Sequence, residues 1–284
     1  MLTSLANGVT GLEAFQQEMD VIGNNISNIN TPAFKAGITD FADALSDTIR
    51  SSSAGTATTS GVPSMQVGTG VSVVDIASNW SAGSLTNTGI SNDLGIQGNG
   101  FFVVRNTVTN SNYVTQAGNF SVDGNGYLVT ATGERVQGYS DAGLTTLGDI
   151  KIDTTGESAA SIAAGATLQS YTVGQNGQIT VNLSDGTSFV RGQILMQNFQ
   201  APQMLISEGN NLYSGMANAG GLATMSAAGT SGLGTIQSGY LEASNVDLSN
   251  EMANLITAQR AFEANSKIIT ASDEMLQTLD NLTH

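Results

Sequence analysis

The side chains that most often perform catalysis are nearly absent from this sequence. The chain contains no cysteine, and its one histidine is His284, the last residue. Nucleophilic hydrolases of the Ser/His/Asp and Cys/His types need a histidine inside a folded site, and zinc sites draw mostly on histidine and cysteine. The sequence therefore predicts neither a nucleophilic active site nor a histidine- or cysteine-based metal centre.

Carboxylates and glycine-rich stretches are weaker candidates. Residues 95–100 (GIQGNG) hold three glycines, but in the wrong order for a dinucleotide loop and between expected strands. Residues 123–126 (DGNG) resemble half of a calcium loop, without the third oxygen ligand or the distant Glu. No feature singles out two carboxylates as a hydrolytic pair. We therefore expect turns at both stretches, no metal or other cofactor, and no enzymatic activity.

Composition limits the possible partners. Only 11% of the 284 residues are charged, and 23 acidic against 8 basic residues give a net charge of −15. Phosphate backbones and acidic lipids repel such a chain, so we expect no nucleic-acid partner. No run of about eighteen apolar residues is present, so we expect no membrane insertion. The opening residues lack the features of an ordinary secretory signal, which predicts a cytoplasmic protein or another export route.

The elements expected to organise the chain are its two ends. Apolar side chains recur every seven residues across 245–284, which predicts a long helix with one apolar seam, capped by Asp247. The main series comprises Leu248, Leu255, Phe262, Ile269 and Leu276, with Ala261, Ile268, Met275 and Leu282 beside it. Such a helix is too long for the rest of a compact domain to cover and needs a partner.

Residues 3–29 offer that partner because they show the same periodicity. The apolar positions are Leu5, Leu12, Phe15, Met19, Ile22, Ile26 and Ile29, and Pro32 follows them. Two matched helices predict an α-helical coiled coil that joins the ends of the chain. The alternative is that both helices pack separately on the core of the middle domain.

The segment after the first helix is predicted to contain a short helix and an arm. The apolar residues Ile38, Phe41, Leu45 and Ile49 are spaced three or four apart, and Asp40, Asp43 and Asp47 would share a face. We interpret that acidic face as solvated rather than as a cation site. Residues 51–70 are mostly Ser, Thr, Gly and Ala, which predicts a flexible, extended arm.

Beyond residue 71 the periodicity changes to two, which indicates strands. Ile179, Val181 and Leu183 alternate with polar residues, and 101–104 is typical of a buried strand. Dipeptides such as Asn176-Gly177 supply the positive φ of tight hairpins. The predicted fold class is α+β, with terminal coiled-coil helices at 1–32 and 239–284, a short helix and arm at 33–74, and a mainly antiparallel β domain at 75–238.

Several long motifs resemble one known family. Residues 11–35 (GLEAFQQEMDVIGNNISNINTPAFK) resemble the N-terminal signature of the bacterial flagellar rod and hook proteins, and 239–276 resemble their C-terminal signature. Residues 93–102 and 118–129 resemble the β domain that the family shares. The resemblance covers about half of the chain and both of its ends.

The resemblance implies a structural subunit of the flagellar axis. Terminal helices would pair into an inner tube and the β domain would form the outer wall. Expected partners are copies of the chain in a helical tube, neighbouring axial proteins of the rod, hook cap and hook–filament junction, and the flagellar type III export apparatus. The expected location is the bacterial flagellum, outside the cell after export, or from periplasm to outer membrane for a distal rod.

The apolar rows of the two ends are the expected self-assembly residues. They are Leu5, Leu12, Phe15, Met19, Ile22, Ile26, Leu248, Leu255, Phe262, Ile269 and Leu276. Exposed apolar seams are unfavourable in a single molecule, so we expect the ends to become ordered when neighbouring subunits cover them. Contacts from head to tail would then generate an open helix rather than a closed ring.

Within the family, the sequence favours a hook subunit that transmits motor torque to the filament. Residues 133–139 and 245–249 resemble the hook protein, although the chain is short for one. The alternative is the distal rod subunit, because the arm at 47–70 resembles an additional stretch found in the distal rod protein. Two other classes fit less well. A peptidoglycan hydrolase would need an acidic catalytic pair, and residues 140–240 are poor in Glu; a β-rich adhesin would not need heptad ends.

Overall fold

The computed structural model describes residues 2–55, 60–156, 165–221 and 224–283. The predictions for arm residues 56–59, for β-domain residues 157–164 and 222–223, and for His284 lie outside the described residues. Contacts divide the chain into two units. The helical unit comprises residues 1–28, 36–79 and 246–284, and the β unit comprises residues 29–35 and 80–245.

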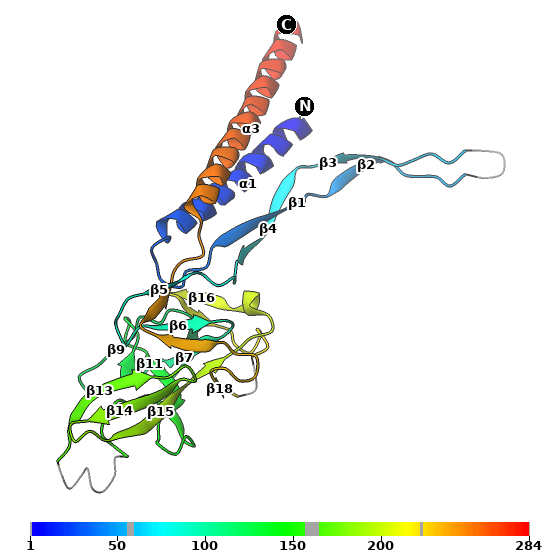
Figure 1. Cartoon of the computed structure of the whole chain (residues 1–284). Helices are drawn as coiled ribbons and strands as arrows, with labels where there is room; N and C mark the ends of the chain where they lie inside the picture. Colours follow the sequence, from blue (N-terminus) through cyan, green and yellow to red (C-terminus); the bar gives the residue numbers. More distant parts are fainter. Residues whose placement is uncertain (1, 56–59, 157–164, 222–223, 284) are drawn as a thin grey trace. The chain divides into compact units, whose positions relative to one another are not determined.

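Two long helices dominate the helical unit. Helix α1 spans Leu2–Ser27 and helix α3 spans Leu248–Thr283, and they lie side by side in antiparallel directions (Figure 1). The predicted cap of α3 is confirmed, because the Asp247 carboxylate accepts a hydrogen bond of 2.8 Å from the amide of Ser249. Glu251 lies in the first turn, where a negative charge suits the unpaired amides of a helix N-terminus.

The helical unit also contains a long hairpin arm, which corrects the sequence prediction. Strands β1 (Gly37–Asp43) and β4 (Val71–Ser78) pair in antiparallel fashion, and so do β2 (Ser46–Arg50) and β3 (Met65–Gly68). The predicted short helix is therefore wrong. The described part of the arm at 60–68 belongs largely to this hairpin rather than to a flexible linker.

The reason is that a pairing partner overrides a local pattern. Residues 71–78 are rich in Val and Ile, which favour extended backbone, and they pair with the whole of β1. The pairing shifts register between Asp40 and Phe41, where Val74 has no opposite residue. The extra residue is on β4, and within β1 the apolar residues Ile38 and Phe41 are spaced three apart, which imitates a helical period.

The β unit is built around one large antiparallel sheet, to which the described residues contribute twelve strands. Its main path follows the order β13-β14-β15-β11-β7-β8-β17-β16. These strands are β7 (Phe101–Arg105), β8 (Asn112–Thr115), β11 (Arg135–Tyr139), β13 (Leu168–Val173), β14 (Gln178–Leu183), β15 (Ser188–Gln197), β16 (Ile206–Gly209) and β17 (Leu212–Ser214). The mainly antiparallel β domain is thus confirmed.

Shorter strands complete the β unit. Strands β9 (Ser121–Val122), β10 (Leu128–Val129), β12 (Leu147–Asp149) and β18 (Ser226–Ala227) join the main path from the side. Two further pairs are β6 (Leu94–Gln97) with β19 (Thr235–Ser238), and β5 (Leu85–Asn87) with β20 (Tyr240–Glu242). A 3₁₀ turn, η1, spans Pro202–Met204. The boundary of this unit at Trp80, rather than at 75, follows from the pairing of β4 with β1.

The core of the β unit matches the predicted alternation. Ile179, Val181 and Leu183 are all buried, as are Phe101 to Val104. Gly177 and Gly186 have φ of 82°, a conformation that glycine adopts without strain and that the tight turns around β14 require. One cluster of apolar residues lies around Phe102 and Ile194, and a smaller one joins Phe101, Phe199 and Tyr213.

Candidate assembly interface

Small residues of α1 allow the two helices to approach closely. A Cβ atom placed on Gly8 would lie 3.0 Å from Cγ1 of Ile269, and one placed on Gly11 would lie 2.5 Å from Nδ2 of Asn265. The register therefore pairs the start of α1 with residues near 265–269 of α3. Glycine at these two positions lowers the helix propensity of α1, but the absence of a Cβ atom permits a short distance between the helix axes.

The inner face of α3 follows a heptad pattern, but only one of its rows is apolar. The residues least exposed along this face are Glu251, Leu255, Ala258, Phe262, Asn265, Ile269 and Ser272. Leu255, Phe262 and Ile269 are therefore half-buried as the sequence predicts. The row beside them consists of small or polar residues, which suits the close approach at Gly8 and Gly11.

The remaining large apolar residues of α3 are exposed, and Ala261 of the second series is half-buried. Leu248 and Leu276, from the predicted main series, and Ile268, Met275 and Leu282, from the second series, all lie on the surface. We call Ile268, Met275, Leu276, Leu279 and Leu282 the C-terminal strip. Leu282 exposes 81% of its area. The strip is uncovered because α1 lies against the row of small and polar residues of α3, and Figure 1 shows that α3 also continues beyond the start of α1.

The predicted rows of α1 are better covered. Ile22 is buried, and Leu5, Leu12, Phe15, Met19 and Ile26 are half-buried. Phe15 contacts Phe41 of β1, with ring centroids 5.8 Å apart, so α1 packs on both α3 and the arm. Burial raises the pKa of the Glu18 carboxyl on the inner face of α1.

The arm exposes a second group of apolar residues. Leu45 exposes 89% of its area, and Ile38, Ile49, Val67, Val74 and Ile76 are also exposed. Away from α1 the arm is a two-stranded ribbon without a covering layer, an arrangement that is only marginally stable in water. Together with the C-terminal strip, the arm gives the helical unit more exposed apolar surface than scattered single residues would.

Asn25 joins three elements of the helical unit. Its Oδ1 accepts a hydrogen bond of 2.8 Å from the amide of Gly37, and its Nδ2 donates to the Gly37 carbonyl at 2.9 Å and to Glu251 Oε1 at 3.3 Å. The side chain is buried. It therefore fixes the end of α1, the start of β1 and the first turn of α3 to one another.

A buried ion pair plays the same part in the β unit. Lys35 Nζ lies 2.7 Å from Glu242 Oε1, and the two side chains are 1% and 3% exposed. Lys35 also donates to the Ser81 carbonyl at 3.1 Å, and Glu242 accepts from the Gly83 amide at 2.8 Å. We call this group the junction clasp. It joins the segments that follow α1, follow β4 and precede α3.

A second charged cluster lies within the sheet of the β unit. Asp149 accepts hydrogen bonds from Arg105 at 2.7 Å, from Arg135 at 3.1 Å and from Gln137 at 2.5 Å. Burial alone would raise the pKa of Asp149, but the bonds from Gln137, Arg105 and Arg135 outweigh burial and lower it. Asp149 is thus bound by three side chains, as expected for a structural network, although Nε of Arg105 is buried without a hydrogen-bond partner among the described residues.

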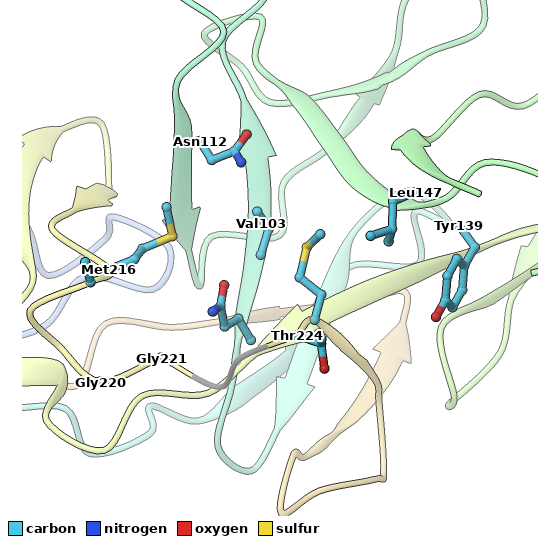
Figure 2. Close-up of a pocket in the computed structure, with 11 residues that line it drawn as sticks. Val103, Asn112, Tyr139, Leu147, Met216, Gly220, Gly221 and Thr224 are labelled. Carbon is cyan, nitrogen blue, oxygen red and sulfur yellow. The ribbon is translucent and has the colours of Figure 1, made fainter. Parts of the chain in front are cut away.

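One pocket of the β unit is poorly suited to acid–base chemistry. It has a volume of about 530 Å³ and lies between β7, β8, β11, β12, β15 and the segments 216–221 and 224–225. Figure 2 shows its lining, which includes Val103, Asn112, Tyr139 and Met216. None of the described residues that line it is Asp, Glu, His, Lys or Arg. The described residues also contain no cluster of three potential metal ligands, and no described helix is long and apolar enough to span a membrane.

Sequence reasoning missed several of these interface residues. Ala258, Asn265 and Ser272 recur every seven residues, and that small or polar series signals a close helix contact opposite Gly8 and Gly11. The exposed face of the arm was missed because the segment was expected to be a helix and a linker. No local signal indicates the ion pair, since 207 positions separate its two members.

Three family models match this chain. The model described as flagella basal body rod protein matches residues 5–35, flagellar hook protein FlgE/F/G D1 domain matches 95–181, and flagellar basal body rod FlgEFG protein C-terminal matches 237–282. The matched segments contain Lys35 and Glu242 of the junction clasp, and Asn25 and Glu251 of the helical unit. The residues that join the chain segments thus lie in the segments that define the family.

Individual relatives extend this match to the whole chain. The flagellar basal-body rod protein FlgG of Bacillus subtilis is 40% identical over 282 residues, covering 99% of both chains. The flagellar hook protein FlgE of Borreliella burgdorferi is 25% identical over 443 aligned positions, so it contains a large region without a counterpart here. A solved Helicobacter pylori hook protein, FlgE2, covers 46% of this chain and 38% of its own at 14% identity and a TM-score of 0.22.

The family models that match both ends and the β unit agree with the relative named as a rod protein, which matches this chain from end to end. This chain belongs to the family of flagellar basal-body rod and hook proteins, which are structural components of the bacterial flagellum and not enzymes.

Proposed function

We propose that this chain is a subunit of the distal flagellar rod and polymerises into a tube through its terminal helices. The sequence alone favoured a hook subunit. The end-to-end match to a relative named as a rod protein supports the rod, and the long unmatched region of the hook relative weighs against the hook. A rod subunit would transmit torque through a straight shaft rather than through a bending joint.

The observation that carries the proposal is the exposed C-terminal strip. Its five large apolar residues lie on a side of α3 that α1 does not cover. A strip of this length on a single helix is the kind of surface that a coiled coil buries. Helices from neighbouring copies would cover the strip, and the inner tube would consist of residues 1–32 and 239–284.

Polymerisation and ordering of the ends are coupled in this proposal. In a free subunit the strip gains nothing from packing, so the last turns of α3 would fray until neighbours arrive. The partners are copies of the same chain, adjoining axial proteins and the type III apparatus that exports the subunit. Each copy presents the strip at one end of its helical unit, so the contact is heterologous and extends into an open helix.

A charge placed in the strip tests the proposal. The double variant Met275→Asp/Leu282→Asp puts two carboxylates where apolar contact is expected, and Asn281→Asp adds a charge on the opposite side of α3. We expect the double variant to abolish polymers of the purified protein in electron micrographs, whereas Asn281→Asp still forms them. Removal of residues 250–284 should also abolish polymers. Filaments formed by the double variant at the wild-type concentration would refute assembly through the strip.

The form of the polymer distinguishes rod from hook. Straight segments that end at the outer-membrane ring of a flagellated cell are expected for a distal rod subunit. Curved and flexible tubes would instead identify a hook subunit.

A further inference from the structure

Helix α1 carries two acidic side chains one heptad apart on its exposed side. They are Glu13 and Asp20, and α1 contains no basic residue. Neither carboxylate forms an ion pair among the described residues. We call these two residues the acidic row. A spacing of seven residues brings two side chains to nearly the same side of a helix, so both carboxylates can meet one partner helix.

Helix α3 carries a matching pair of opposite charge. Arg260 and Lys267 are also exposed and seven residues apart, and we call them the basic row. Lys267 forms no ion pair among the described residues, and Arg260 lies 3.2 Å from Glu263. The side chains of Arg260 and Glu263 are 77% and 59% exposed, and so open an ion pair contributes little to stability. A guanidinium has five N–H donors, so Arg260 can bind a second carboxylate.

The two rows face away from each other within one subunit. Gly11 of α1 lies against Asn265 of α3. At 3.6 residues per turn, each row lies about 140–180° around its own helix from these contact residues. The acidic row is therefore turned away from α3, and the basic row is turned away from α1. A second molecule is needed to cover either row.

The charge of the helical unit makes the basic row a place where another copy is attracted. The sequence ranges of this unit contain thirteen acidic residues and three basic ones, Arg50, Arg260 and Lys267. Two copies that approach through most of this surface therefore repel each other. Glu263 and Glu274 lie on the same side of α3 as the basic row and limit the attractive stretch to one heptad, which is also the length of the acidic row.

We propose that the acidic row of one copy binds the basic row of the next copy. The proposal rests on the polymer proposed above and specifies which helix faces meet within it. Each copy uses a different face toward each of its two neighbours, so the contact is heterologous, as an open helix requires. Complementary charges beside a coiled coil decide which helices pair and in which orientation, while buried apolar surface supplies most of the affinity.

The spacing of the rows also predicts a register. Copies that point the same way along a tube place α1 of one copy antiparallel to α3 of the next, as within a subunit. Glu13 then pairs with Lys267, and Asp20 pairs with Arg260. Within its own subunit Glu13 is level with Glu263 along the helix pair. The α3 helix of the neighbour is therefore displaced by four residues, or about 6 Å along the helix.

Charge reversal tests the pairing. Glu13→Lys/Asp20→Lys leaves a copy with two basic rows, and Arg260→Glu/Lys267→Glu leaves a copy with two acidic rows. Each variant alone should need about thirtyfold more protein to polymerise, because two attractive pairs become repulsive. The Glu13→Lys/Asp20→Lys variant carries less net charge than the wild type, so a change in general repulsion between copies would instead favour its polymerisation.

Two combinations should restore polymerisation. In an equimolar mixture of the two variants, copies can alternate so that every acidic row meets a basic row. The fourfold variant Glu13→Lys/Asp20→Lys/Arg260→Glu/Lys267→Glu exchanges the rows within one chain. We expect both samples to polymerise within about threefold of the wild-type concentration. Far-ultraviolet circular dichroism of each variant establishes that the helices are retained.

Disulfide cross-linking tests the register, because the chain has no cysteine of its own. Under oxidation by diamide, Glu13→Cys/Lys267→Cys should give ladders of linked copies on denaturing gels. Glu13→Cys/Ala253→Cys is the matched control, since Ala253 is exposed on the same side of α3 but lies two heptads away. The control should remain monomeric on the same gels.

The outcomes separate this proposal from the polymer proposal. If the wild type and both reversed variants polymerise at the same concentration, the pairing of the rows is overturned and the polymer stands. Reversed variants that fail to polymerise even when mixed would also overturn the pairing. If the wild type forms no polymers, cross-linking in concentrated solution decides. Ladders from Glu13→Cys/Lys267→Cys that the control lacks would support the pairing, and the absence of ladders would overturn it.

Discussion

The junction clasp offers a demanding test of how this fold is held together. Lys35 donates to Glu242 and to the Ser81 carbonyl, and its side chain is almost completely buried. Lys35→Met keeps the length of the side chain but removes the charge and both hydrogen bonds. Glu242 then retains the Gly83 amide and has no positive partner.

The expected loss of stability is large for a single side chain. Hydrogen bonds to charged groups contribute about 1.5–3 kcal/mol each, and removing one partner of a buried ion pair typically destabilises by about 3–5 kcal/mol. We therefore expect Lys35→Met to lower the free energy of unfolding of the β unit by about 3–5 kcal/mol. Most single domains have about 5–15 kcal/mol in total, so this loss is a substantial fraction.

A double-mutant cycle tests whether the pair itself is responsible. Glu242→Gln alone leaves the Lys35 ammonium buried with neutral acceptors, whereas Lys35→Met/Glu242→Gln leaves no buried charge. We expect the double variant to be more stable than the sum of the single effects predicts, by about 1–3 kcal/mol. Trp80 fluorescence during urea unfolding measures the β unit, which contains all three residues.

A half-exposed ion pair of the same unit provides the control. Lys151 lies 3.1 Å from Asp153, and their side chains are 35% and 24% exposed, so Lys151→Met should cost at most about 1 kcal/mol. Hydrogen exchange supplies an independent measurement, because Lys35→Met should reduce protection in residues 29–35, 80–83 and 240–245 together. A Lys35→Met variant no less stable than Lys151→Met would refute the assignment of the clasp.

Two other predictions concern the β unit. A Cβ on Gly118 would lie 1.7 Å from the Leu94 carbonyl oxygen, so Gly118→Ala should lower the urea midpoint by the equivalent of about 3 kcal/mol, whereas Gly124→Ala, in open space, should change it little. The lowered pKa of Asp149 means that its contribution to stability is complete above the unfolded value near 4 and is lost as pH falls through the folded value. Asp149→Asn should therefore be less stable than the wild type at pH 7, and its free energy of unfolding should fall less steeply below about pH 4. Parallel curves of unfolding free energy against pH for the two proteins would contradict this role.

The sequence correctly predicts those helices and strands whose signal lies within the element itself. The seven-residue spacing of Leu255, Phe262 and Ile269 indicates both the helix and its inner face, and Asp247 marks its start. Alternation around Ile179 and the glycines of tight turns identify strands and hairpins in the β unit. In each case the side chain that carries the signal acts within its own element.

The failures concern interactions between distant segments. Residues 38–49 have a helical spacing, but pairing with residues 65–78 decides their structure. The rows expected to form one seam on α3 are separated in the structure, because Gly8 and Gly11 draw α1 toward the small residues. The Ile268 row is left exposed as a result. A helical period locates a face, but only the partner determines which row of that face is covered.

Contacts between distant segments also explain why the sequence motifs at the two ends, which contain no catalytic residues, can define this family. Lys35 and Glu242 are charged residues of two segments of the β unit that lie far apart in sequence, and each neutralises the other. Asn25 and Glu251 do the same within the helical unit. A buried charge without its partner strongly disfavours every other arrangement of these segments. The motifs at the two ends are therefore best understood as one set of mutually dependent contacts.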